Sequence, residues 1–121
     1  YYSLRNYKKA IYYHFLSLKI AREVNNLLGE GQSLNNIGNV YYDVGDYAKA
    51  IDYYKQHLDI ALEIKDPLAE SQALGNLGSV YYALGEFREA IFYQEKGLSL
   101  ARKIPDRLGE GQSLGNLGLI Y

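Results

Sequence analysis

Residues Asn76 to Ile91 read NLGSVYYALGEFREAI, a pattern that specifies the architecture of the chain. Its leucines, valine and tyrosines recur at the spacings of three and four residues that one buried face of a helix requires. Gly85 then stands where a left-handed residue ends a helix, and Glu86 opens a second helix with its own apolar pattern. The stretch therefore predicts two helices joined by a tight turn.

The same pattern returns every forty residues. The periods 1–40, 41–80 and 81–120 align without a gap, neighbouring copies agree at nearly half of their positions, and Tyr121 opens a fourth copy. A period of this length is typical of repeats that stack into a continuous core. We therefore predict that residues 1–121 form a single all-α array, an α-solenoid of antiparallel helix pairs with about three repeats.

Capping residues mark the helix ends. Asp46 and Asp66 are expected N-caps, because a carboxylate accepts hydrogen bonds from the free amides of the first helical turn. Arg5 replaces the cap glycine in the first copy, where a left-handed residue would be strained by about 1 kcal/mol or more. The expected helices cover residues 6–26, 28–43, 47–65, 68–84, 87–104 and 108–121.

One glycine recurs inside the first helix of each pair, although glycine there costs about 1 kcal/mol relative to alanine. We predict that it marks the point where this helix crosses the second helix most closely, because only a residue without a side chain lets two backbones approach that far. Small residues on the second helix would face it. The glycines are Gly38, Gly78 and Gly118, and the facing alanines are Ala10, Ala50 and Ala90.

These residues carry a signature, L-x-x-L-G-x-x-Y followed by G-[DE]-[YF] and A-I. It resembles the tetratricopeptide repeat family, in its forty-residue Leu-Gly-Asn type, over the whole chain. The resemblance implies a right-handed superhelix of helix pairs whose first helices line a concave groove. In the last complete copy the signature residues are Leu74, Leu77, Gly78, Tyr81, Gly85, Glu86, Phe87, Ala90 and Ile91.

Composition narrows the function classes. The chain has no cysteine and a net charge of −1, so it offers neither a thiolate metal site nor a basic stripe for nucleic acid. The longest apolar run is too short for a membrane span, and we expect a cytoplasmic protein. The two histidines, His14 and His57, lie more than a full repeat apart without paired acids at ligand spacing. We therefore expect no enzyme, no metal and no cofactor.

The free face of the first helices is the predicted binding surface of a protein-interaction scaffold. An asparagine amide carries both donors and acceptors, so a ladder of asparagines could hold the backbone of an extended peptide. The alternative, that these amides bond a neighbouring helix, stays open. Because the face carries no lysine or arginine, we expect an uncharged or mixed segment. The predicted groove residues are Gln32, Asn35, Asn36, Asn39, Tyr42, Gln72, Asn76, Ser79, Tyr82, Gln112 and Asn116.

The two ends suggest an alternative function. Tyr1 and Tyr2 resemble the tail of a first helix, and no polar capping repeat closes either end, so we expect a fragment of a longer array. Apolar strips at the two ends could stack in register and build a head-to-tail homo-oligomer that does not close on itself. The strips comprise Ile11, Leu18 and Ile20 at one end, and Leu114, Leu117 and Ile120 at the other.

Overall fold

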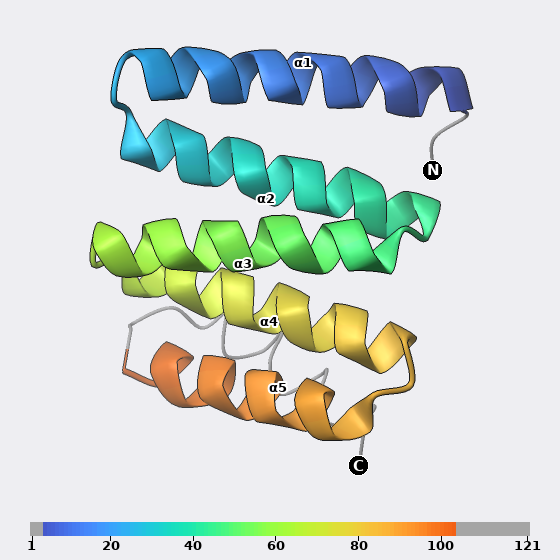
Figure 1. Cartoon of the computed structure of the whole chain (residues 1–121). Helices are drawn as coiled ribbons and strands as arrows, with labels where there is room; N and C mark the ends of the chain where they lie inside the picture. Colours follow the sequence, from blue (N-terminus) through green and yellow to red (C-terminus); the bar gives the residue numbers. More distant parts are fainter. Residues whose placement is uncertain (1–3, 104–121) are drawn as a thin grey trace. The chain divides into compact units, whose positions relative to one another are not determined.

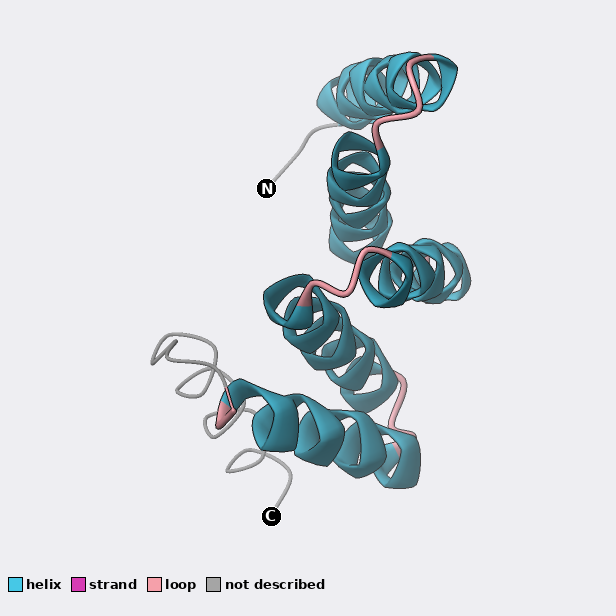
Figure 2. Ribbon diagram, turned by 90° about the vertical axis from the view of Figure 1, so that its left-hand side faces the viewer, coloured by secondary structure: helices cyan, strands magenta, loops and turns pink. Residues whose placement is uncertain are grey.

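The computed structural model describes residues 4–103, which form five α-helices joined by short turns (Figure 1). No strand occurs among these residues, so the all-α prediction is confirmed for them (Figure 2). The expected helix bounds hold to within three residues, while the helix expected over 108–121 lies outside the described residues. The helices are α1 (Leu4–Glu23), α2 (Leu27–Val44), α3 (Tyr47–Glu63), α4 (Pro67–Ala83) and α5 (Phe87–Ala101).

The chain divides into two compact units, Tyr1–Ile60 and Ala61–Tyr121. In the first unit α1 lies against α2, and α3 supplies side chains that pack on α2. In the second unit α4 lies against α5. That the two units continue a single array stays a prediction.

The turns within helix pairs use glycine, as the sequence predicts. Gly45 and Gly85 have φ angles of 85° and 78°, a left-handed conformation that strains other residues. The following amide closes each turn, because Asp46 N–H donates to Tyr41 O and Glu86 N–H donates to Tyr81 O, both at 2.9 Å. The predicted cap at Asp46 is confirmed by the Lys49 amide, which donates to its Oδ1 at 3.3 Å.

The turns between helix pairs have a left-handed residue that is not glycine. Asn25 and Lys65, forty residues apart, have φ angles of 55° and 54°. The next residue then caps the new helix: Asn26 Oδ1 accepts from Gly29 N–H at 3.0 Å, and Asp66 Oδ1 accepts from Ala69 N–H at 3.3 Å. The predicted N-cap at Asp66 is therefore confirmed. The left-handed residues that precede the two caps were not predicted. The strain expected at Arg5 is wrong, because α1 begins before it at Leu4.

Helix α5 lacks the side-chain N-cap hydrogen bond that α2, α3 and α4 have. Glu86 occupies the position equivalent to Asp46, yet its side chain makes no capping hydrogen bond. We expect Glu86→Asp to raise the free energy of unfolding by about 0.5–1 kcal/mol, because the shorter carboxylate reaches the first-turn amides. Urea denaturation followed by helicity would measure the change. Glu86→Gln is the control; an equal gain there would show that lost charge, not capping, stabilises the helix.

The core of the first unit lies between α1 and α2. Leu18, Leu34 and Ile37 are buried together, with partly buried side chains around them. The prediction of Leu18 as part of an exposed strip is therefore wrong, because Leu18 faces α2 and is only 3% exposed. Ile11, seven residues earlier on the same side of α1, packs against this core too, whereas Ile20 is exposed as predicted.

The recurring glycine accommodates a side chain rather than a backbone. A Cβ at Gly38 would lie 2.7 Å from two ring carbons of Tyr54, and one at Gly78 would lie 2.5 Å from Nε2 of Gln94. A side chain of the second helix therefore occupies the space that the glycine leaves without a Cβ, which we call the notch. This corrects the prediction that the two helix backbones meet at this glycine. Gly118 lies outside the described residues.

A close approach of two helix backbones in the second unit occurs elsewhere, at Gly97. A Cβ there would meet Gly75 N and Ser71 O at 3.6 Å. The Ser71 hydroxyl also donates to Gly97 O at 3.4 Å, which joins α4 to α5 at this point. A second glycine of the pair, not the one singled out in the sequence, therefore serves the predicted purpose.

Candidate functional site

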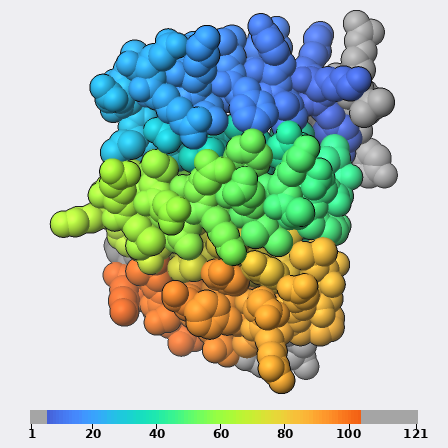
Figure 3. All heavy atoms as spheres, in the orientation of Figure 1, coloured from blue at the N-terminus to red at the C-terminus, as the bar shows by residue number. Residues whose placement is uncertain are grey.

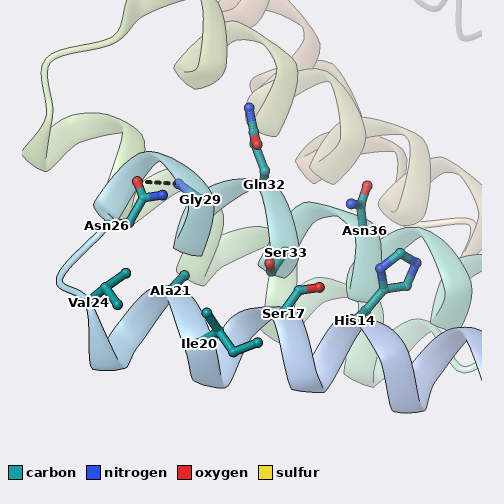
Figure 4. Close-up of a pocket in the computed structure, with 10 residues that line it drawn as sticks. All are labelled: His14, Ser17, Ile20, Ala21, Val24, Asn26, Gly29, Gln32, Ser33 and Asn36. Carbon is teal, nitrogen blue, oxygen red and sulfur yellow. Dashed lines mark hydrogen bonds between the residues drawn. The ribbon is translucent and has the colours of Figure 1, made fainter.

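A pocket opens between α1 and α2 of the first unit, with a volume of about 370 Å³ (Figure 4). Its ten lining residues all come from these two helices and the turn between them, and none is an aspartate, glutamate, lysine or arginine. Two predicted groove residues, Gln32 and Asn36, belong to it. The pocket therefore places part of the predicted binding face beside a hollow that the sequence did not reveal.

The pocket changes character along its length. Because α2 runs back along α1, Val24 and Ala21 lie near the turn, close to Gly29 of α2 (Figure 4). His14 lies at the far end, beside Asn36 (Figure 4). One end is thus mainly apolar and the other end polar.

Gln32 and Asn36 are available amides among the predicted groove residues of α2. Both side chains are exposed, and neither makes a hydrogen bond to another residue within 4–103. They stand four residues apart, which places them one above the other on a single face of α2. Their donors and acceptors are therefore open to a ligand.

Asn39 has a structural partner instead. The Tyr54 hydroxyl donates to Asn39 Oδ1 at 2.6 Å, joining α3 to α2 beside the Gly38 notch. Burial raises the pKa of Tyr54 well above its usual value, and the nearby Asp43 and Tyr42 add to the rise. Asn39 thus bonds a neighbouring helix, which was the alternative left open by the sequence. Its partner is a side chain, Tyr54.

This tyrosine predicts a dependence of stability on alkaline pH. Above the ordinary pKa of 10.0 the unfolded chain releases the Tyr54 proton while the folded chain keeps it. The unfolded state then binds fewer protons, so the free energy of unfolding falls as pH rises, by up to about 1.4 kcal/mol per pH unit for this group. Tyr54→Phe should show a shallower fall in urea denaturation between neutral and alkaline pH. Identical slopes in the two proteins would contradict the account.

Helix α4 presents fewer free polar groups than α2. The Ser79 hydroxyl donates to Gly75 O of its own helix at 3.1 Å, and Gln94 Nε2 donates to the same carbonyl at 3.0 Å. Asn76 is half-buried and is not free of interactions within the chain, and the same holds for Asn35 of the first unit. Among the predicted groove residues of α4, Gln72 is the one with an amide side chain that is exposed.

The predicted groove tyrosines pack across the turns of their own pairs. The Tyr42 ring lies 5.6 Å from that of Tyr47, and the Tyr82 ring lies 5.5 Å from that of Phe87. Burial raises the pKa of Tyr42, with Tyr47 and Asp43 contributing. An aromatic residue opens the second helix in both pairs, and this recurrence was the signal for the contact. A role of these tyrosines in binding stays a prediction.

The remaining predictions concern residues that the structure does not describe, metal binding and membrane insertion. Gln112, Asn116, Leu114, Leu117 and Ile120 lie outside residues 4–103. Within that range, no cluster of histidine, aspartate and glutamate is arranged to hold a metal ion. None of the described helices combines the length and apolarity that crossing a bilayer requires.

Comparison with known proteins identifies the repeat. The sequence profile of the tetratricopeptide repeat matches residues 1–63 and 69–121. The chain belongs to this family. The tetratricopeptide repeat makes it a helical-repeat module of the kind that mediates protein interactions, and the family is generally a non-enzymatic scaffold. The resemblance to the tetratricopeptide repeat family is thereby confirmed, while the assignment to its Leu-Gly-Asn type stays a prediction.

Solved structures agree on the tetratricopeptide-like fold. The crystal structure of BtubC (BKLC) from P. vanneervenii has a TM-score of 0.84 and 22% identity, covering 95% of this chain and 48% of that protein. The apo form of RapI has a TM-score of 0.80 and 26% identity, covering 88% of this chain and 30% of that protein. The chain thus spans less than half of either protein. No curated protein sequence matches it.

Proposed function

We propose that the chain binds an extended segment of another protein along the exposed face of its first helices. The observation that carries the proposal is the pair Gln32 and Asn36, two exposed amides without hydrogen-bond partners among the described residues, at the edge of the α1/α2 pocket. An exposed amide offers both a donor and an acceptor. It therefore suits the alternating N–H and C=O groups of a peptide backbone.

The spacing of the two amides supports an extended ligand. Four residues of a helix rise about 6 Å, and two residues of an extended chain span about 6.7 Å. A segment lying along α2 can therefore present equivalent backbone groups to Gln32 and Asn36 in turn. A helical ligand, whose backbone groups are already bonded internally, gains nothing from these amides.

The predicted groove amides of α2 and α4 are not equally available for binding. Gln72, forty residues after Gln32, is an exposed amide at the equivalent position of α4. Asn76 has an interaction within the chain, so its contribution requires that interaction to be exchanged. Asn36 is therefore the member of the ladder on which the proposal depends most.

A peptide screen tests the proposal. Fluorescein-labelled synthetic peptides of random sequence would be selected on the wild type and then titrated against Gln32→Ala/Asn36→Ala. We expect the variant to lose at least about tenfold in affinity, because two hydrogen bonds are removed, each worth about 1 kcal/mol. Lys55→Ala, an exposed change on α3 outside the pocket, is the control. Equal affinity of the wild type and the amide variant, at equal helicity, would refute the assignment.

A second candidate is end-to-end association through α1. This helix contributes to the outer surface of the first unit (Figure 3) and exposes Tyr12, Tyr13, Leu16 and Ile20. These side chains support the candidate in place of Leu18. Sedimentation over a wide concentration range tests it with Tyr13→Glu and Leu117→Glu. A wild type that stays monomeric throughout, with variants that behave identically, would dismiss self-association.

A further inference from the structure

The apolar end of the α1/α2 pocket leaves much of its surface in contact with water. Ile20 and Val24 line it, yet their side chains remain 52% and 66% exposed. Ala21, which is buried, lies beside them. An apolar group entering here would remove these side chains from water, which is the main favourable term in most protein association.

The charge of the pocket restricts what enters. No carboxylate, ammonium or guanidinium lines it, and the α2 amide of Gly29 at its apolar end already donates to Asn26 Oδ1. A charged side chain would therefore lose part of its hydration without gaining a counter-ion. The pocket selects against both acidic and basic groups.

The size of the pocket restricts it further. About 370 Å³ lies near the lower limit of ligand-binding cavities, which range from about 300 to 1,000 Å³. This volume admits one large side chain together with part of the backbone that carries it. The polar end, where Asn36 and His14 lie, adjoins the surface on which a peptide backbone would run (Figure 4).

We infer that this pocket is an anchor subsite, which receives one large uncharged side chain, aliphatic or aromatic, from an extended partner segment. The inference rests on the proposed function and adds a specificity to it. Gln32 and Asn36 hold the backbone without regard to sequence, while the wall formed by Ile20 and Val24 reads one position. The partner class is thus an extended segment with a single leucine-like or phenylalanine-like anchor and no charge at that position.

The test scans the selected fluorescein-labelled peptides, with alanine, leucine, phenylalanine, aspartate and lysine placed at each position in turn. On the wild type we expect one position where leucine or phenylalanine binds tenfold to a hundredfold better than alanine, on the order set by burying one large apolar side chain. Aspartate or lysine at that position should bind no better than alanine.

The wall variant Ile20→Ser/Val24→Ser should lose the preference at that one position and retain the weaker affinity of the alanine peptide. Both side chains are exposed, so the fold should persist, which helicity verifies. Tyr12→Ser/Tyr13→Ser is the matched control, because it removes exposed apolar surface from α1 outside the pocket and should leave the preference intact.

The outcomes separate the two proposals. An unchanged preference in the wall variant, or a charged residue favoured at the anchor position, overturns the subsite while the amide variant still tests the proposed function. Loss of the preference in the wall variant with no effect in Gln32→Ala/Asn36→Ala supports the subsite and overturns the role of the amides. A wild type that binds no peptide overturns both.

Discussion

Gly38→Ala is expected to lower the free energy of unfolding by about 2 kcal/mol, although alanine is the better helix former. The helix gains about 1 kcal/mol in propensity. The new Cβ, however, would lie 2.7 Å from the rigid Tyr54 ring, and overpacking of this kind costs about 1–3 kcal/mol. Displacing the ring also breaks the part-buried hydrogen bond to Asn39, at a further cost of about 0.5–1.5 kcal/mol.

Gly75→Ala is the matched control for this prediction. It lies on a first helix too, but a Cβ there would meet no atom of the described residues within 4 Å, so we expect a gain of about 1 kcal/mol. Gly78→Ala, only three residues away, should destabilise because it displaces the Gln94 side chain from Gly75 O. Urea denaturation of the three variants measures all these changes. A gain in stability in Gly38→Ala would show that the notch is not filled as described.

Leu18→Glu is expected to destabilise the first unit by about 4 kcal/mol or more. Truncating a buried leucine alone costs about 2–5 kcal/mol, and a carboxylate between Leu34 and Ile37 would lack a partner. Since a small domain is stable by only about 5–15 kcal/mol, helix α1 should lose much of its packing.

Ile20→Glu, two residues away and exposed, is the control and should change stability by no more than about 0.5 kcal/mol. Circular dichroism during thermal unfolding distinguishes the two variants. If Leu18→Glu were as stable as the wild type, the burial of Leu18 against α2 would be wrong, and its original assignment to an association surface would return.

The sequence predicted those features that depend on neighbours along the chain. Helix bounds, the caps at Asp46 and Asp66 and the left-handed Gly45 and Gly85 follow from local chemistry. Leu18 was misplaced because α1 carries apolar residues around much of its circumference, and periodicity alone does not say which face another helix covers.

Tertiary partners explain the remaining errors at the candidate site. The exposure of Gln32 and Asn36 followed from helical spacing, but Asn39 lies on the same helix and differs only because Tyr54 of α3 reaches it. The pocket was missed because the predicted binding residues lie on first helices alone, whereas α1 is a second helix and supplies four of the ten lining residues. A site shared by two helices needs their packing to be known.

The two filled notches also constrain how such a chain can diversify. Gly38 and Asn39 receive Tyr54, whereas Gly78 and Ser79 stand beside Gln94, so each pair carries its own combination on two consecutive helices. Recombination within the turn between α2 and α3 would join halves of different combinations, leaving an asparagine without its tyrosine. Exchange in the turn between pairs would keep each combination whole. The helix pair is therefore the smallest segment that can be exchanged between copies without separating a glycine from the side chain that packs on it.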